Sequence, residues 1–216
     1  MSLMVGVSRV HFPVTGLGPG HRVGIWFQGC SIRCPGCMSR DTWSRARTKT
    51  SLKDLMSLIE PWLERADGVT ISGGEPFDQP EALRELLTAL RPAGRLSTLV
   101  YSGYAFEALQ ARHADILAVL DVLISEPFDE SDPQRKPLRG SANQRVHCFT
   151  DAGVTLWRQA KSEWSLSGAK LDLIAGEDGA LWLAGVPGPG DLERLSRQLG
   201  SAGLALRTSA GRLGEQ

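Results

Sequence analysis

Apolar and polar residues alternate along the first two thirds of the chain in blocks that predict short strands between amphipathic helices. In Ser51–Arg65 and Pro80–Leu90 the leucines recur three and four residues apart, which places them on one side of a helix. Ala105–Arg112 is predicted as a third helix. Strands are predicted in four short, mainly apolar runs, at Val23–Gln28, Val69–Ile71, Leu99–Tyr101 and Val119–Ile124. Apolar strands that alternate with helices indicate an α/β fold with a parallel sheet covered by helices.

A polar or cysteine-containing motif follows each predicted strand. In chain order these motifs are Cys30, Ser72-Gly73-Gly74-Glu75-Pro76, Ser102-Gly103-Tyr104 and Ser125-Glu126. Parallel strands end at the same edge of a sheet, and barrels and open parallel sheets carry their sites at that edge. We therefore expect the four loops to converge on one rim.

Three of the four cysteines, Cys30, Cys34 and Cys37, lie within eight residues, and the fourth is Cys148. Thiolates this close together favour one soft metal centre, and an iron-sulfur cluster is the usual occupant. Three ligands for a four-iron cluster leave one iron open for chemistry, as an open position distinguishes catalytic from structural zinc. A closed zinc site would need a fourth ligand, from Cys148 or a histidine, and remains an alternative.

The segment Ser72–Pro76 also has two interpretations. Its glycines, Gly73 and Gly74, would let a ligand lie against the backbone, and Glu75 offers an acceptor for an ammonium group. Taken alone, it is equally a plain turn between a strand and a helix.

Composition narrows the function classes. With 216 residues, of which 42% are hydrophobic, the chain is long enough for one domain with a real core. Lys plus Arg number 24 and Asp plus Glu 24, so no overall field would attract nucleic acid or an anionic membrane. We find no apolar run of membrane-spanning length and no secretory signal in Met1–Gly20, so we expect a soluble protein in the reducing cytoplasm. A local basic run follows the cysteines, at Arg33, Arg40, Arg45, Arg47 and Lys49, and is either a solvated loop face or a docking patch for an acidic partner.

These motifs together resemble the radical S-adenosylmethionine (SAM) enzymes, and within them the small activases of glycyl-radical enzymes. The cysteine triad has the spacing of that family, and Ser72–Pro76 matches its glycine-rich, methionine-binding segment. The resemblance covers roughly residues 5 to 150. The residues that flank the motifs look like those of the activases of pyruvate formate-lyase and of anaerobic ribonucleotide reductase. The flanking matches are Gly18-Pro19-Gly20-His21-Arg22, Phe27-Gln28-Gly29-Cys30, Cys34-Pro35-Gly36-Cys37, Arg40-Asp41-Thr42-Trp43, Asp121-Val122-Leu123-Ile124 and Leu138–Arg145. Of these, Arg139–Arg145 brings no mechanism and is either a polar loop, in which Asn143 caps a turn, or a contact to the cofactor.

The resemblance implies a partial, incomplete TIM-like parallel β/α barrel over residues 1–150. Residues 151–216 are expected to form a C-terminal extension packed on the same domain. In that extension, Lys170–Ala175 and Ala180–Val186 flank Glu177-Asp178-Gly179 as a predicted hairpin, and Pro189–Leu199 is predicted as a short helix.

The resemblance also implies the chemistry. Cys30, Cys34 and Cys37 would hold a 4Fe-4S cluster that SAM caps. Gly73, Gly74 and Glu75 would bind the methionine amine, with Ser102 near the cofactor. Reductive cleavage of SAM would yield a 5'-deoxyadenosyl radical that takes hydrogen from a glycine of a partner enzyme, with a flavodoxin or ferredoxin as reductant. No residue is assigned a catalytic role.

Two departures from the family pattern lie beside the implied site. Met38-Ser39 stands where many relatives have His-Asn, and Ser125-Glu126-Pro127 replaces the usual Asp-Gly. Two other functions therefore stay open. One is a radical SAM enzyme acting on a peptide or small metabolite, although Cys148 alone cannot build the auxiliary cluster that peptide-modifying relatives often carry. The other is a non-catalytic iron-sulfur or zinc protein, which would have no use for the glycine-rich loop.

Overall fold

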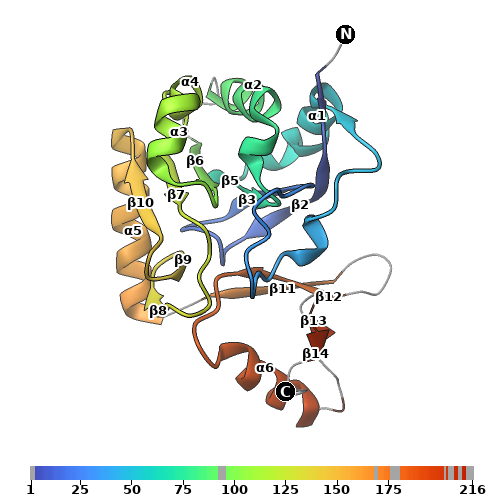
Figure 1. Cartoon of the computed structure of the whole chain (residues 1–216), viewed down its shortest axis with the longest axis vertical. Coiled ribbons are helices and arrows are strands. Elements are labelled where there is room, and N and C mark those ends of the chain that lie inside the picture. The colour runs from blue at the N-terminus through green and yellow to red at the C-terminus, as the bar shows by residue number, and fades with distance from the viewer. Residues whose placement is uncertain are drawn as a thin grey trace.

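The computed structural model describes residues 3–91, 96–167, 170–175, 181–201, 203, 207–208 and 211–212. At its centre is a six-stranded sheet with the order β10-β7-β6-β5-β3-β2 (Figure 1). The four inner strands run parallel and the two edge strands antiparallel to their neighbours. The strands are β2 (Val7–Val14), β3 (Arg22–Phe27), β5 (Gly68–Gly73), β6 (Ser97–Tyr101), β7 (Val122–Ser125) and β10 (Arg145–Cys148). The predicted α/β class with a parallel core is confirmed, and the two edge strands make the sheet mixed.

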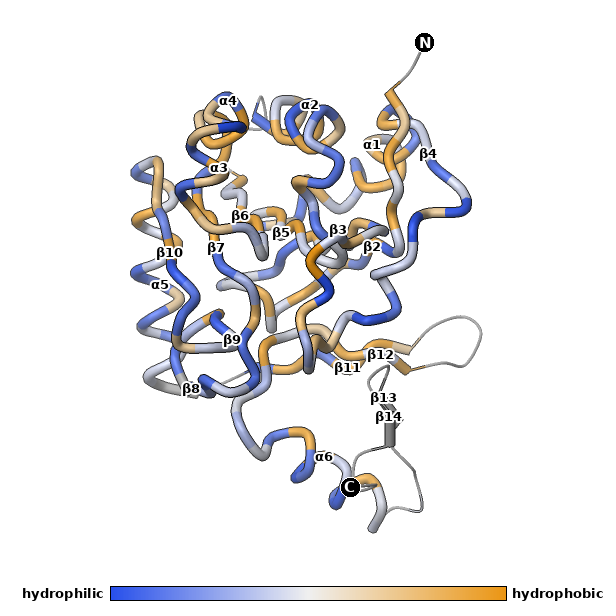
Figure 2. The backbone as a smooth tube through the Cα atoms, in the orientation of Figure 1, coloured by the Kyte–Doolittle hydropathy of each residue, from blue (hydrophilic) through white to orange (hydrophobic). Residues whose placement is uncertain are grey.

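One face of the sheet is covered by the helices that connect the parallel strands. These are α1 (Leu52–Leu63), α2 (Pro80–Leu90), α3 (Phe106–Arg112) and α4 (Ala114–Leu117). Ile25 of β3 and Ile71 of β5 are fully buried against Leu55, Ile59 and Leu86 of the helices. Figure 2 shows hydrophobic and hydrophilic residues alternating along α2, as expected for a helix with one buried side.

The opposite face is covered from two directions. Helix α5 (Asp151–Ser167) packs Leu156 and Ala160 onto strand residues that include Val122 and Ile124. Beside it, β11 (Leu171–Ala175) and β12 (Leu181–Gly185) form an antiparallel pair, called the ribbon below.

The ribbon lies against β2 and β3. Its residues Ile174 and Ala184 are buried with Val14 and Trp26, and Trp182 makes an edge contact with Trp26 at 5.1 Å between ring centroids. Smaller elements complete the described chain, namely β1 (Met4–Val5), η1 (Arg40–Thr42), β4 (Thr50–Ser51), η2 (Pro76–Asp78), β8 (Pro133–Lys136), β9 (Arg139–Ser141), α6 (Asp191–Ser201), β13 (Arg207–Thr208) and β14 (Gly211–Arg212). Among these described helices none is long and apolar enough to cross a bilayer.

A buried arginine joins the amino-terminal ends of the parallel strands. Arg22 is only 1% exposed and donates to the Thr70 and Ser97 hydroxyls and to the carbonyl oxygens of Val69 and Ser97 at 2.6–3.0 Å. Burial lowers the pKa of its guanidinium to about 10. The four hydrogen bonds offset the cost of burying this charge and fasten β3 to β5 and β6 at the edge opposite the cysteines.

Several sequence predictions need correction. Strand β7 begins at Val122 rather than Val119, because α4 and a turn occupy the chain before it. Arg139–Arg145 is no simple loop, since it contains β9 and the first residue of β10. The last described helix begins at Asp191, two residues after Pro189. The Asp191 carboxylate accepts a hydrogen bond from Gly188 N at 2.7 Å. The predicted turn Glu177–Gly179 lies outside the described residues.

Candidate metal and cofactor site

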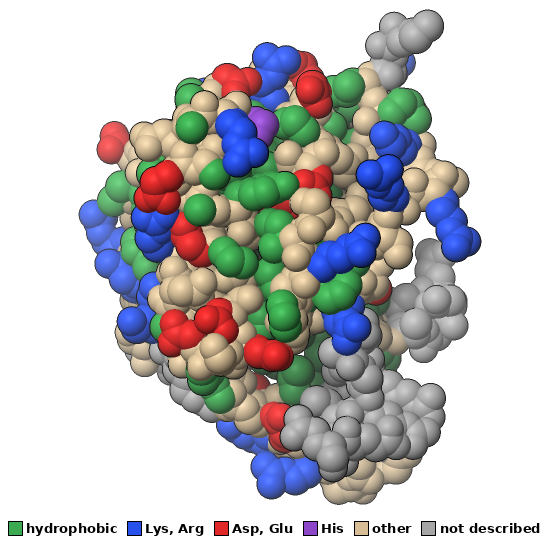
Figure 3. Space-filling view, viewed as in Figure 1, with side chains coloured by type: hydrophobic (Ala, Val, Ile, Leu, Met, Phe, Trp, Pro, Cys, Tyr) green, Lys and Arg blue, Asp and Glu red, His purple; other side chains and the backbone are tan. Residues whose placement is uncertain are grey.

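The four loops that follow the parallel strands lie together at one edge of the sheet. The cysteine loop and the glycine-rich loop are joined by Gly74 N to Phe27 O and Glu75 N to Gly29 O, both 2.8 Å. The third and fourth loops are joined by Glu126 N to Tyr104 O at 3.1 Å. Figure 3 shows this face of the molecule, with a band of hydrophobic side chains down its middle and Lys and Arg side chains on both sides of it. The predicted convergence of the loops is therefore present.

All three clustered cysteines are free thiols and half-buried. Burial raises the pKa of the Cys30 and Cys34 thiols, and the charges of Cys30 and Cys37 raise that of Cys34 further. Deprotonation of these thiols costs free energy, and a bound metal cation would offset this cost by stabilising the thiolates. Three soft thiols on one short loop are the donor set that an iron-sulfur cluster uses.

Within the part of the chain that the structure describes, no three His, Cys, Asp or Glu side chains are placed to hold one ion. A four-iron cluster binds each thiolate on a different iron, so its ligands stand further apart than those of one zinc. Three half-buried thiols on one short loop fit a cluster that takes one thiolate on each of three irons.

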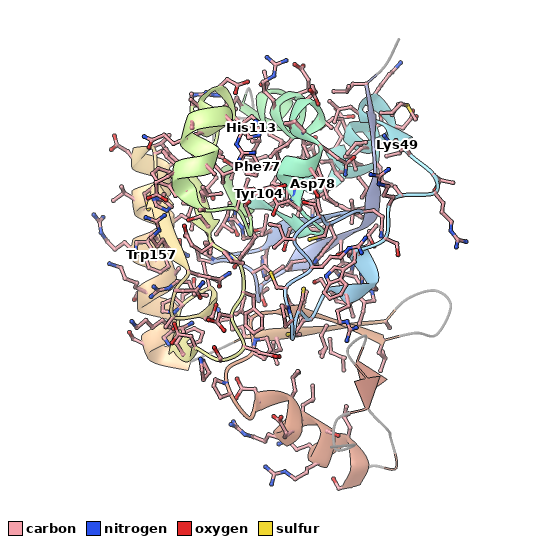
Figure 4. The ribbon with its side chains drawn as sticks, viewed as in Figure 1. Lys49, Phe77, Asp78, Tyr104, His113 and Trp157 are labelled. Carbon is pink, nitrogen blue, oxygen red and sulfur yellow. The ribbon has the colours of Figure 1, made fainter. Side chains whose placement is uncertain are left out.

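Asp78 ties the cysteine loop to the rest of the rim. Its carboxylate accepts from Ser31 N at 2.7 Å and Ser31 Oγ at 2.9 Å, and also from the Tyr104 hydroxyl at 2.8 Å. Figure 4 shows Asp78 and Tyr104 near the centre of this face. Asp78 was not predicted from the sequence, because it stands three residues beyond Glu75 and carries no motif of its own.

Glu75 is a buried carboxylate, 1% exposed. One of its oxygens accepts from Phe77 N at 3.0 Å and Ser102 Oγ at 2.9 Å, and the other accepts from Gly103 N at 2.8 Å. Burial raises its pKa to about 7 despite these three donors. The predicted cofactor residues Glu75 and Ser102 therefore contact each other, and Glu75 joins the second loop to the third.

The two glycines of the second loop are required by the packing of the loops. Gly73 has a φ of +97°, and a Cβ there would lie 2.6 Å from the backbone of Phe27. A Cβ on Gly74 would lie 2.0 Å from Gly29 O. A side chain at either position would push the glycine-rich loop away from the cysteine loop.

The fourth loop contains a separate polar cluster. Ser125 Oγ lies 2.9 Å from His147 Nε2 and donates to the Glu126 carboxylate. Glu126 has a φ of +79° and also accepts from Phe106 N and from Arg145. These contacts link β7 to β10 and fix the loop that carries the unusual Ser125-Glu126 pair.

The sequence of this chain is similar to those of several known proteins. The model of the family described as "4Fe-4S single cluster domain" matches residues 17–147. The pyruvate formate-lyase-activating enzyme of Clostridium pasteurianum is 32% identical over 149 residues, which cover 65% of this chain and 61% of that enzyme.

Two reductase-activating relatives match over most of their length. The anaerobic ribonucleoside-triphosphate reductase-activating protein of Enterobacteria phage T4 is 30% identical over 62% of this chain and 88% of its own length. The protein of that name from Escherichia coli (strain K12) is 28% identical over 60% and 90%. Among solved structures, the crystal structure of QueE from Escherichia coli aligns at a TM-score of 0.39 with 23% identity over 46% of this chain and 53% of that chain.

Proposed function

Because the chain belongs to the 4Fe-4S single cluster domain family, we propose that it is a radical SAM activase that generates a glycyl radical on a partner enzyme. The observation that carries this proposal is the meeting of the three free cysteines and the glycine-rich loop on one rim. The relatives named as activating enzymes for pyruvate formate-lyase and anaerobic ribonucleoside-triphosphate reductase support it. An anaerobic ribonucleotide reductase is the partner we favour.

We assign the cluster to Cys30, Cys34 and Cys37, and the methionine end of SAM to Gly73, Gly74, Glu75 and Ser102. When bound, the reduced 4Fe-4S cluster supplies one electron that cleaves SAM to methionine and a 5'-deoxyadenosyl radical. Glu75 is 1% exposed, and its carboxylate already accepts from Phe77 N, Ser102 Oγ and Gly103 N. Its part in binding is therefore to hold the loop in the shape that receives the amine.

The surrounding architecture is included in the proposal. We infer that the four parallel strands and their covering helices form a partial TIM-like barrel over residues 1–150, with residues 151–216 as its extension. A partner glycine has no side chain to block approach to its α carbon, so a backbone loop can enter such an open rim. The reducing cytoplasm, where thiols stay free, is the compartment that suits these cysteines, and a flavodoxin or ferredoxin is the reductant.

The test uses protein reconstituted with iron and sulfide without oxygen. With SAM and dithionite it is expected to form 5'-deoxyadenosine, and an added glycyl-radical enzyme is expected to show a glycyl radical by electron paramagnetic resonance. Cys34→Ala is expected to abolish both signals, while Cys148→Ala, the matched control, keeps them. One zinc per chain and no labile sulfide would contradict the proposal, and turnover that no glycyl-radical enzyme stimulates would favour a peptide or metabolite substrate.

A further inference from the structure

The segment Arg139–Arg145, which has no role in the proposed function so far, holds the chain that follows β7. Figure 1 shows β8 and β9 beside that chain. Three side chains of the segment, called the clamp below, bond three backbone groups of residues 126–129 at 2.8–3.2 Å. Gln144 Nε2 donates to Glu126 O, Asn143 Nδ2 donates to Pro127 O, and Ser141 Oγ accepts from Asp129 N. Three hydrogen bonds within four residues fix the path of the backbone there.

The clamp is itself held in place by its neighbours. Ser141 is fully buried, and Gln144 Oε1 accepts from Gly140 N at 2.7 Å. A Cβ on Gly140 would lie 2.9 Å from the ring of Phe128, so this glycine lets the ring pack directly on β9. Because the clamp side chains are ordered in this way, they lose little conformational entropy when they bond residues 126–129. The clamp is therefore a firm support for this part of the chain.

Residues 126–130 lie directly against the cysteine loop. Gly36 has a φ of +69°, and a Cβ there would lie 2.3 Å from Glu130 Oε2. Burial raises the pKa of the Cys34 thiol, and a hydrogen bond from the Phe128 backbone acts against that rise. The clamp bonds residues 126, 127 and 129 and leaves the N–H of Phe128 to the sulfur. The supported chain thus presents one backbone donor to a predicted cluster ligand.

We propose that the clamp residues Ser141, Asn143 and Gln144 are positioning residues that hold the Phe128 N–H against the Cys34 sulfur and thereby raise the reduction potential of the cluster. This inference rests on the proposed function, because it requires a cluster on Cys34. When the cluster gains one electron from a reductant, negative charge grows on its sulfurs, and the proton stays on Phe128 N. A fixed N–H dipole stabilises the reduced cluster more than the oxidised one.

The first measurement is a redox titration of the reconstituted protein without SAM, followed by electron paramagnetic resonance. Ser141→Ala/Asn143→Ala removes two of the three clamp bonds, leaves net charge unchanged and alters no residue assigned to the cluster or to SAM. Gln159→Ala/Ser162→Ala, at exposed positions of α5, is the control. The clamp variant is expected to lower the equilibrium constant for one-electron reduction at least about threefold, a potential lower by roughly 30 mV. The control is expected to match wild type.

Hydrogen exchange of the cluster-free chain gives a second readout that needs no metal. The amides of residues 126–130 are expected to exchange at least about tenfold faster in the clamp variant than in wild type, and at the wild-type rate in the control. Asn143→Ala alone, at a half-buried position, is expected to show a smaller change in the same direction in both measurements. This single variant supplies the potential if the double variant takes up no iron.

The outcomes separate the clamp from the function on which it rests. Faster exchange with an unchanged or raised potential would show that the clamp residues only support the fold, and would overturn the proposal. Unchanged exchange would show that other contacts hold residues 126–130, with the same consequence. Wild-type protein that binds no iron and sulfide would reject the proposed function itself, whereas the exchange of the cluster-free chain would still report whether the clamp holds this segment.

Discussion

At the scale of single residues, two carboxylates organise the rim without belonging to the cysteine motif. Asp78 holds Ser31 and Tyr104, and Glu75 holds Ser102, Phe77 and Gly103. Between them they connect the first three loops of the site. Replacing either should therefore disturb cofactor binding through loop shape, even where the cluster cysteines remain in place.

The raised pKa of Glu75 leads to a pH-dependent prediction. Its carboxyl has a pKa of about 7 in the folded protein and 4.5 as the reference value, so the folded state binds this proton more tightly. The stability linked to this proton is present below pH 4.5 and is lost as the pH rises through about 7. In the cluster-free protein, the free energy of unfolding of Glu75→Gln should rise relative to that of wild type by up to about 3 kcal/mol between pH 4.5 and 8. Urea unfolding measures this difference.

Glu60→Gln on α1 is the control, because that carboxylate is exposed. The difference in free energy of unfolding between Glu60→Gln and wild type gives the baseline for the Glu75→Gln measurement. A Glu75→Gln difference that follows this baseline would show that the buried carboxyl does not titrate in this window.

At the scale of elements, helix α5 is the part of the core that the sequence analysis missed. Leu156 is 4% exposed on its inner side and Val154 is 44% exposed on its outer side. Leu156→Ala should lower the free energy of unfolding by about 2–5 kcal/mol, since it leaves a cavity against β6 and β7. Val154→Ala, the control in the same helix, should cost less than about 1 kcal/mol. Chemical denaturation measures both, and equal losses would mean that α5 does not pack as described.

Which elements could be predicted depends on how strongly burial patterns them. Helix α2 was predicted with its observed bounds, because Pro80 opens it and its leucines repeat along one side. Strands β2 and β10 were missed because edge strands carry polar residues, as in Arg145-Val146-His147-Cys148, and lack a continuous apolar run. Helix α5 was missed because its apolar residues are few and widely spread.

Some residues of the candidate site could be predicted from the sequence and others could not. The cysteines and the glycine-rich loop are recognisable by their spacing, and their loops meet because the parallel strands before them end at the same edge of the sheet. Asp78 and the Ser125–His147 contact depend on residues that are 47 and 22 positions apart, and only the folded chain brings such pairs together. The roles of Gly73, Gly74, Glu75 and Ser102 toward SAM remain predictions.

At the scale of the whole molecule, the carboxyl-terminal part completes the core. Helix α5 buries the side of β6 and β7 that faces away from α1 and α2, and the ribbon covers Trp26. Asp172 of the ribbon accepts from Thr15 N, Thr15 Oγ1 and Gly16 N at 2.6–2.8 Å, which fastens the ribbon to the chain between β2 and β3.

Two shortened chains should separate these contributions. A chain that ends at Ser167 loses the ribbon and should fold with a Tm lowered by several degrees, because Trp26 and Val14 become exposed. A chain that ends at Thr150 also loses α5 and should fail to give a cooperative thermal transition. Calorimetry distinguishes the two cases, and a sharp transition from the shorter chain would show that residues 1–150 fold by themselves.

The hydrogen bonds from Ser31 to the Asp78 carboxylate affect how the iron-sulfur cluster would assemble. Because this carboxylate fastens the first turn of the cysteine loop to a neighbouring loop, the conformational entropy of that turn is lost during folding and not at assembly. Iron and sulfide would then bind to a loop whose first turn is already ordered. If air destroyed the cluster, the turn would keep this conformation, and a new cluster could be assembled on it.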